Sequence, residues 1–164
     1  GIPDPKTKRV GLLPFDVDPN YSVGVGLDEL YANLSRLAAR SVTVILDTCF
    51  SGQTRERKLL FADARGITVA PRPGAIPIGI TVLSAATGAQ ISGPLKDKEH
   101  GVFTYYVLKG LGGTADGNSD RRVTMTELAS YVSKEVKAQA ARLGWEQTPN
   151  LDGDGSRVLV RFKN

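Results

Sequence analysis

Two short apolar runs limit what this chain of 164 residues can fold into. Residues 41–46 read SVTVIL and residues 80–85 read ITVLSA, so both are rich in β-branched side chains and nearly free of charge. Runs of this kind are typical of strands buried on both faces of a parallel sheet, with helices covering each face. We therefore expect an α/β sandwich with a mostly parallel central sheet.

The remaining elements are predicted from apolar spacing and from turn residues. A short strand is expected over residues 10–15, and a closing strand over 157–162. Apolar stripes predict helices over 27–40, 102–111 and 126–143, the last capped by Thr126. Residues 152–155 (DGDG) are expected to form a hairpin turn or loop.

Composition excludes several classes of protein. The net charge is +4 and the basic residues form no stripe interleaved with aromatics, so nucleic acid is not an expected partner. No apolar run approaches the roughly 18 residues of a membrane helix, so no membrane partner is expected either. The single cysteine excludes an internal disulfide framework, and we place the protein in the cytoplasm.

Residues 1–164 are expected to be one domain that lacks its N-terminal part. The opening GIPDP has no initiator Met and no signal sequence, and is typical of the interior of a longer polypeptide. Residues 53–79 lack periodicity and form the longest expected loop. Because such a long loop inside a compact domain is uncommon unless it has a function, we expect it to be functional and flexible.

The expected buried strand at 41–46 leads to Cys49, the only cysteine of the chain. Open α/β sheets bind ligands at the carboxyl ends of their strands, where an activated thiol can attack an acyl carbon. Free cysteines are also among the most buried residues and commonly only pack. Position alone leaves both interpretations open.

The motif DTCFSG at residues 47–52 resembles the Asp-x-Cys-x-Ser-Gly nucleophile motif of metacaspases and bacterial caspase-like peptidases. The resemblance extends over nearly the whole chain, through LLPFD at 12–16, LSAA at 83–86, HGVFTYYVLKGL at 100–111 and QTP at 147–149. It implies a caspase-like three-layer sandwich and a thiol endopeptidase.

The resemblance assigns a role to single residues. Cys49 would be the nucleophile, and its backbone N–H with that of Gly1 would form the oxyanion hole. In this family the general base is a histidine about 50 residues before the cysteine. In this chain that position falls just ahead of Gly1. An upstream segment or another chain is therefore expected to supply it, and His100 is expected to be structural or to start a helix.

Asp47 lies two residues before Cys49 and therefore on the same side of the strand. The resemblance places its carboxylate in the pocket that binds the P1 residue, the one before the bond that is cut, and this pocket would take Arg or Lys. The alternative is that Asp47 caps the following turn. Ser84 is expected to form a pocket wall, or to be an ordinary residue at the end of a strand. If the enzyme selects basic residues, the 53–79 loop offers sites for self-processing, and we favour Arg65. The alternative is a charged loop that is never cut.

Residues 116–127 have the spacing of an EF-hand loop. Oxygen ligands would come from Asp116, Asn118 and Asp120, from the backbone carbonyl of Arg122, and from Glu127. The loop has Arg121 where the motif needs glycine, so calcium would bind weakly. The alternative is a polar connection between two helices. Peptidase chemistry itself requires no cofactor.

Two other functions stay open beside the peptidase acting on a polypeptide substrate. One is an inactive pseudopeptidase or scaffold that keeps the fold without the base, and the other is a calcium-responsive interaction module. The intact 47–52 motif favours the enzyme, because a scaffold has no physical need for a thiol beside a carboxylate at the end of a strand. The isolated chain is expected to be inactive without its histidine.

Overall fold

The computed structural model describes residues 2–3, 10–12, 14, 24–48, 75–87, 90–95 and 98–163. Its α-helices are α1 (Leu27–Ser35), α2 (Val102–Lys109) and α3 (Met125–Arg142), and a π-helical segment η2 (Gly110–Thr114) continues α2. None of the helices in these ranges carries an apolar stretch of membrane-spanning length. The strands are β1 (Ile2–Pro3), β2 (Val10–Leu12), β3 (Val25–Gly26), β4 (Val42–Leu46), β5 (Ile80–Ser84), β6 (Pro94–Leu95), β7 (His100–Gly101), β8 (Arg122–Thr124), β9 (Asn150–Asp152) and β10 (Val158–Arg161).

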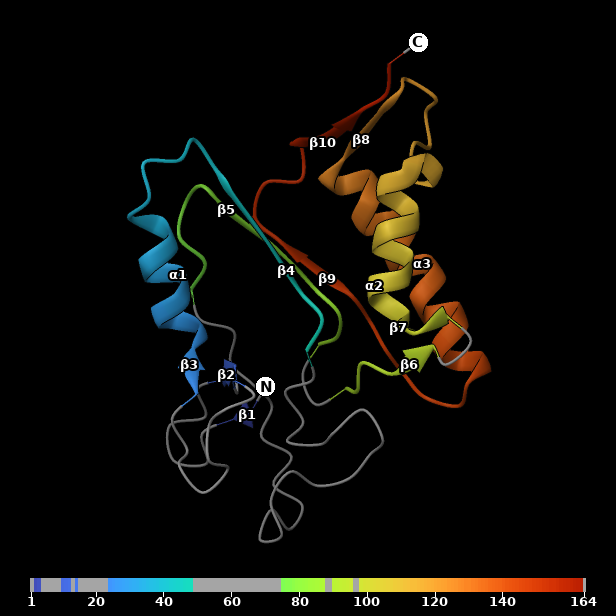
Figure 1. Ribbon diagram of the computed structural model, residues 1–164, viewed down its shortest axis with the longest axis horizontal. Coiled ribbons are helices and arrows are strands. Elements are labelled where there is room, and N and C mark those ends of the chain that lie inside the picture. The colour runs from blue at the N-terminus through green and yellow to red at the C-terminus, as the bar shows by residue number, and fades with distance from the viewer. Residues whose placement is uncertain are drawn as a thin grey trace, which may run out of the picture.

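The two apolar runs form neighbouring parallel strands, as predicted. β4 pairs with β5 in register from Val42 opposite Ile80 to Leu46 opposite Ser84. β9 then adds to the other side of β5 in the antiparallel direction, which gives the order β4-β5-β9. Parallel pairing brings the carboxyl ends of β4 and β5 to the same edge (Figure 1).

The expected caspase-like sandwich with a mostly parallel central sheet is wrong. In the described ranges the chain is a mixed α/β structure whose sheets have only two or three strands. The predicted closing strand exists as β10, but it pairs with β8 in a separate two-stranded sheet instead of extending the central one. The third strand of the central sheet, β9, has three residues and runs antiparallel to β5.

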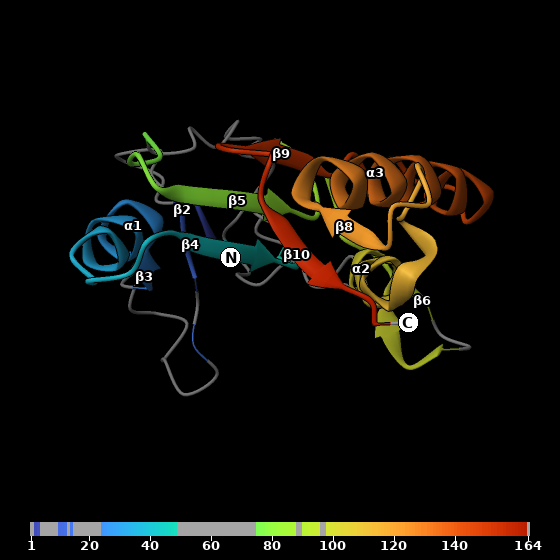
Figure 2. The ribbon, with the colours of Figure 1, turned by 90° about the horizontal axis from the view of Figure 1, so that it is seen from above.

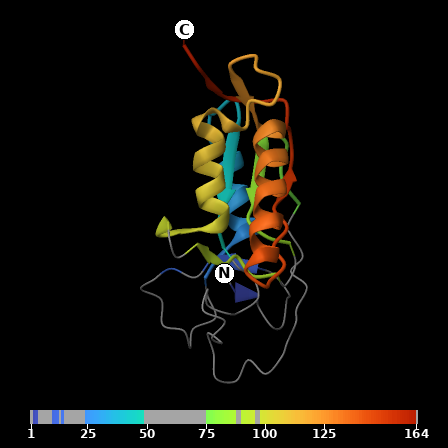
Figure 3. The same ribbon diagram turned by 90° about the vertical axis from the view of Figure 1, so that its right-hand side faces the viewer.

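Helices cover both faces of the β4-β5-β9 sheet (Figures 1 and 2). On one face α1 packs Leu27 and Tyr31 against Leu46 and Val82. On the other face α2 and α3, side by side in Figure 3, form the larger core. Its buried members are Leu83, Ala85, Val102, Phe103, Val107, Ala115, Val123, Met125, Leu128, Val132 and Val136.

Two titrating groups near β9, Tyr31 of α1 and Asp154 of the following turn, have shifted pKa values for different reasons. Burial, followed by the nearby charges of Asp152 and Asp28, raises the pKa of the Tyr31 hydroxyl. The predicted turn after β9 exists, and hydrogen bonds from the side chain and the backbone of Ser156 lower the pKa of Asp154 in it. Gly153 in this turn has φ +101°, and a Cβ there would press on the backbone of β5, so the turn requires glycine.

Two sequence predictions need correction at the edges of the sheet. β4 is half-buried, with Ile45 42% exposed, and so is not buried on both faces. Among the described residues β4 is an edge strand, which leaves one side of it uncovered. The first helix ends at Ser35 and not near residue 40, because Arg36 and Leu37 bond back three residues in a tighter turn.

The N-cap of α3 lies two residues before the predicted one. Thr124, and not Thr126, is the N-cap: its hydroxyl accepts from the backbone N–H of Glu127 at 3.2 Å. The Glu127 carboxylate in turn accepts from the Thr124 N–H at 2.9 Å, which completes a capping box. Thr126 instead donates its hydroxyl to the Gly155 carbonyl at 2.9 Å, tying α3 to the segment before β10.

We predict that Thr124→Ala lowers the free energy of unfolding by about 1 kcal/mol, because it removes the hydroxyl of the capping box. Thr124→Ser keeps that hydroxyl and should stay within about 0.5 kcal/mol of wild type. Urea denaturation followed by circular dichroism measures both. Equal losses in the two variants would show that the methyl group, and not the cap, stabilises this end of α3.

Candidate functional site

The Asp47 carboxylate lies where β4 and β5 end, on the side of the sheet that α2 covers. Leu46 packs toward α1, so the next side chain along the chain points to the opposite face. Ser92 donates its hydroxyl to Oδ1 of Asp47 at 2.5 Å, and Thr104 donates its hydroxyl to Oδ2 at 2.5 Å. Segments 45 and 57 residues away in the sequence thus hold the two oxygens of one carboxylate.

The hydroxyl of Ser92 is held in turn by Gln147. Both side chains are buried, with exposures of 0% and 1%. Nε2 of Gln147 donates to Oγ of Ser92 at 3.2 Å and to the carbonyl of Ala85 at 3.1 Å. Its Oε1 accepts from the N–H of Gly93 at 3.1 Å and from the indole N–H of Trp145 at 3.3 Å. All four hydrogen-bonding positions of the amide are therefore occupied.

The backbone partners of Gln147 belong to the elements that frame the site. The Ala85 N–H donates to the Leu46 carbonyl at 2.8 Å, so the parallel ladder continues one residue beyond β5. The Gly93 carbonyl accepts from Val102, the first residue of α2, at 3.0 Å. Gln147 consequently links the end of the sheet, the segment before β6 and the start of α2.

The first turn of α2 lies beside the carboxylate, because Thr104 is the third residue of that helix. The partial positive charge at a helix N-terminus is favourable for a nearby anion. Hydroxyl hydrogen bonds to an ionised carboxylate are also stronger than bonds between neutral groups. Both features stabilise a negative charge at this position and keep its orientation fixed.

The other predicted site residues divide into two groups. Cys49, Gly1 and Arg65 lie outside the described residues, as does most of the 53–79 loop. Ser84 ends β5, and its hydroxyl donates to the Asn150 carbonyl of β9 at 3.4 Å. That bond ties Ser84 to the sheet, and among the described residues no hydrogen bond joins Ser84 to Asp47.

His100 lies in β7, and its side chain is exposed. It comes directly before α2, which agrees with the expected role at a helix start. No hydrogen bond of its ring occurs within the described ranges. It therefore has no visible link to the Asp47 carboxylate.

The 116–127 loop is closed by its own side chains. Asp116 accepts from the N–H groups of Asp120 and Arg121 at 3.1 and 2.9 Å, and Asn118 accepts from Asp120 at 2.9 Å. Asp120 accepts from the N–H of Arg122, and Glu127 belongs to the capping box of α3. No group of three His, Cys, Asp or Glu side chains suited to a metal occurs in the part of the chain that the structure describes. Calcium binding here stays a prediction.

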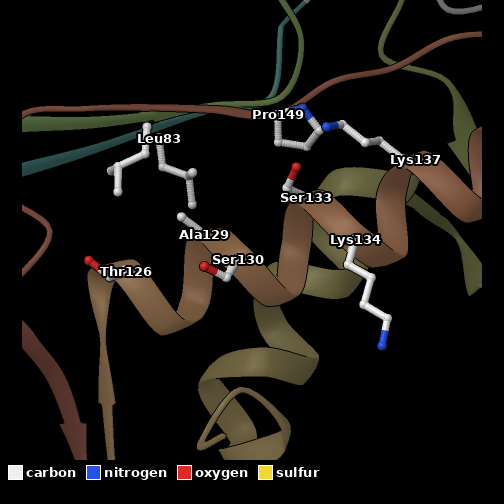
Figure 4. A pocket seen from close by; sticks show the side chains of 9 residues that line it. Leu83, Thr126, Ala129, Ser130, Ser133, Lys134, Lys137 and Pro149 are labelled. Atoms are coloured by element: carbon white, nitrogen blue, oxygen red, sulfur yellow. The ribbon is translucent and has the colours of Figure 1, made fainter.

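A cavity of about 480 Å³ lies between α3 and β9, away from these residues. Figure 4 shows Lys137 extending toward Pro149, whereas Lys134 points away from it. Apolar side chains and hydroxyls complete the lining, from Leu83, Thr126, Ala129, Ser130, Ser133 and Leu151. The cavity shares no lining residue with the network around Asp47.

Sequence reasoning missed the three residues that hold Asp47 in place. Thr104 and Gln147 fall inside segments that carry the family resemblance, but nothing in the sequence assigned them a partner. Ser92 carries no motif at all. The one available signal was polarity at Thr104, which interrupts a helical stretch that is otherwise expected to pack, whereas Gln147 lies in a polar segment and gave no signal.

We predict that Gly93→Ala displaces the Trp145 ring, because a Cβ at residue 93 would overlap the indole. Trp145 is the only tryptophan, so its fluorescence reports this movement directly. We expect a shifted emission maximum and a loss of about 1–3 kcal/mol of stability. Gly112→Ala is the matched control, since a Cβ there meets no atom within 4 Å. An unchanged spectrum in Gly93→Ala would contradict the packing of Trp145 against residue 93.

Millimolar calcium should raise the melting temperature of the wild-type chain slightly if the 116–127 loop binds it, because only the folded loop offers the ligands together. Asp116→Asn should abolish that rise. Magnesium at equal ionic strength is the control for screening. No calcium-specific rise in wild type, or the same rise in Asp116→Asn, would remove the ion from this loop.

Comparison with protein-family models, with curated proteins and with solved structures finds no match to this chain. A functional assignment therefore depends on the residues themselves. Those residues are the motif at 47–52 and the hydrogen-bonded carboxylate that stands at its beginning.

Proposed function

We propose that the protein is a cysteine-type endopeptidase of the cytoplasm that cleaves polypeptides after Arg or Lys. The observation that carries this proposal is the Asp47 carboxylate, held by two hydroxyls at the end of a parallel strand pair. It stands two residues before the only cysteine of the chain. A fixed anion beside a thiol is the combination needed to bind a basic side chain next to the bond that is cut.

In the proposed reaction the Cys49 thiolate attacks the carbonyl carbon of the scissile peptide bond. The C–S bond forms, and the carbonyl oxygen becomes an oxyanion that the backbone N–H groups of Cys49 and Gly1 would stabilise. A histidine takes the thiol proton and returns it to the departing amine, leaving a thioester. Water then hydrolyses the thioester and releases the thiol.

The resemblance places His100 at the start of a helix and not at the position of the base, and its side chain is exposed in β7. We propose that a segment outside this chain supplies the base. Without it, a thiol with the ordinary pKa of about 8.5 is only a few per cent ionised at pH 7. The chain alone should then turn over very slowly.

Preference for a basic P1 residue follows from charge. A guanidinium or ammonium forms charge-assisted hydrogen bonds with a partly desolvated carboxylate, whereas an acidic P1 side chain is repelled by it. The hydroxyls of Ser92 and Thr104 support this role because they orient Asp47 without adding a charge of their own.

The proposal is tested with a form that contains the proposed histidine-bearing segment. Cleavage of fluorogenic peptides with Arg, Lys or Asp at P1 is measured at pH 7. We expect basic peptides to be cut at least about 100-fold faster than the Asp peptide, and Asp47→Asn to lower kcat/KM by about 10² or more. Cys49→Ala should be inactive, whereas Asp154→Asn, which removes an exposed carboxylate in a turn, should match wild type.

Equal cleavage of Asp and Arg peptides would refute the pocket. Full, Cys49-dependent activity of the isolated 164-residue chain would refute the external base. No Cys49-dependent cleavage in any form would favour the scaffold alternative. Mass spectrometry of the incubated long form tests self-processing, for which we propose the bond after Arg65; absence of any Cys49-dependent cut between residues 53 and 79 would reject it.

A further inference from the structure

We infer that Ser92 and Thr104 are positioning residues that make the Asp47 pocket selective for arginine over lysine. The inference rests on the proposed function and narrows its substrate class. It starts from the two hydroxyl bonds at 2.5 Å, one to each oxygen of the same carboxylate.

The direction of both bonds is settled by chemistry. An ionised carboxylate can only accept hydrogen bonds, so each hydroxyl must donate its proton to Asp47. For Ser92 the arrangement is consistent, because its oxygen accepts from Nε2 of Gln147. The orientation of that amide is itself forced, since its other partners are two N–H donors and one carbonyl acceptor.

Two donors on different elements fix the plane of the carboxylate. Thr104 belongs to α2, whereas Ser92 lies in the segment before β6, so a rotation of the carboxylate would break at least one of the two bonds. Ser92 is fully buried and held from behind by Gln147, which is fully buried too. The orientation of Asp47 is therefore set before any ligand binds.

A carboxylate with a fixed plane favours a guanidinium. The planar fork of arginine donates two parallel N–H groups to the two oxygens of one carboxylate, and this geometry is strict. The ammonium of lysine is a compact charge with rotating donors, so it gains little from a fixed plane. Orientation thus strengthens the binding of arginine more than that of lysine.

The single cysteine allows a test that needs no turnover. Peptidyl chloromethyl ketones with Arg, Lys or Ala at P1 alkylate Cys49: a C–S bond forms and chloride leaves. The saturable labelling rate of the 164-residue chain is followed by mass spectrometry at about pH 8.5, where an ordinary thiol is half ionised. Iodoacetamide, which has no P1 side chain, measures the intrinsic reactivity of the thiol in every variant.

We expect the Arg reagent to label wild type about tenfold faster than the Lys reagent, because only arginine uses both fixed oxygens. Thr104→Val, which keeps the shape of the side chain, should reduce the Arg-to-Lys ratio to about twofold or less with the iodoacetamide rate unchanged. Thr104→Ser should restore the ratio, which a purely structural role for the residue would not predict. Ser92→Ala gives an independent second variant.

The possible failures are distinguishable. Equal labelling by the Arg and Lys reagents, both faster than the Ala reagent and both dependent on Asp47, would overturn this inference and leave the proposed peptidase intact. A normal ratio in both Thr104→Val and Ser92→Ala would also overturn it. Equal labelling by all three reagents, with Asp47→Asn unchanged, would remove the basic pocket and the inference with it.

Discussion

The parallel pairing of β4 with β5 is the constraint on which the site depends. It brings Leu46 and Ser84 into register, so both strands deliver their next residues to one edge of the sheet. Asp47 follows the first strand and Ala85 the second, and the bond from the Ala85 N–H to the Leu46 carbonyl carries the ladder past the end of β5. A shift of one residue would turn Asp47 toward α1, away from its hydroxyl donors.

The buried amide of Gln147 makes that edge specific. Moving a polar group out of water costs free energy unless each of its donors and acceptors finds a partner. Hydrogen bonds that do form are stronger in the low dielectric of the protein interior. The arrangement of Ala85, Ser92, Gly93 and Trp145 satisfies all four positions of the amide. The polar network therefore ties the segment before β6 to the end of β5.

Much of the fold was predictable because its signals are local. β-branched runs identified β4 and β5, and apolar stripes identified the three α-helices to within a few residues at most ends. The size of the sheet was not predictable, since the pairing of β10 with β8 instead of the central sheet is a contact between distant segments. Asp47 was identified through its neighbour Cys49. Ser92, Thr104 and Gln147 were missed because their importance lies in contacts that span 45 to 62 residues.

The choice of hydroxyls to hold Asp47 has its own physical logic. A cation in the role of Ser92 or Thr104 would also fix the carboxylate, but it would cancel the charge that the proposed basic P1 side chain would meet. A hydroxyl donates one hydrogen bond and adds no net charge. The desolvation of such a carboxylate is offset by the bonds from Ser92 and Thr104 and by the first turn of α2. The bonds from Ser92 and Thr104 thus orient the carboxylate without adding a positive charge of their own.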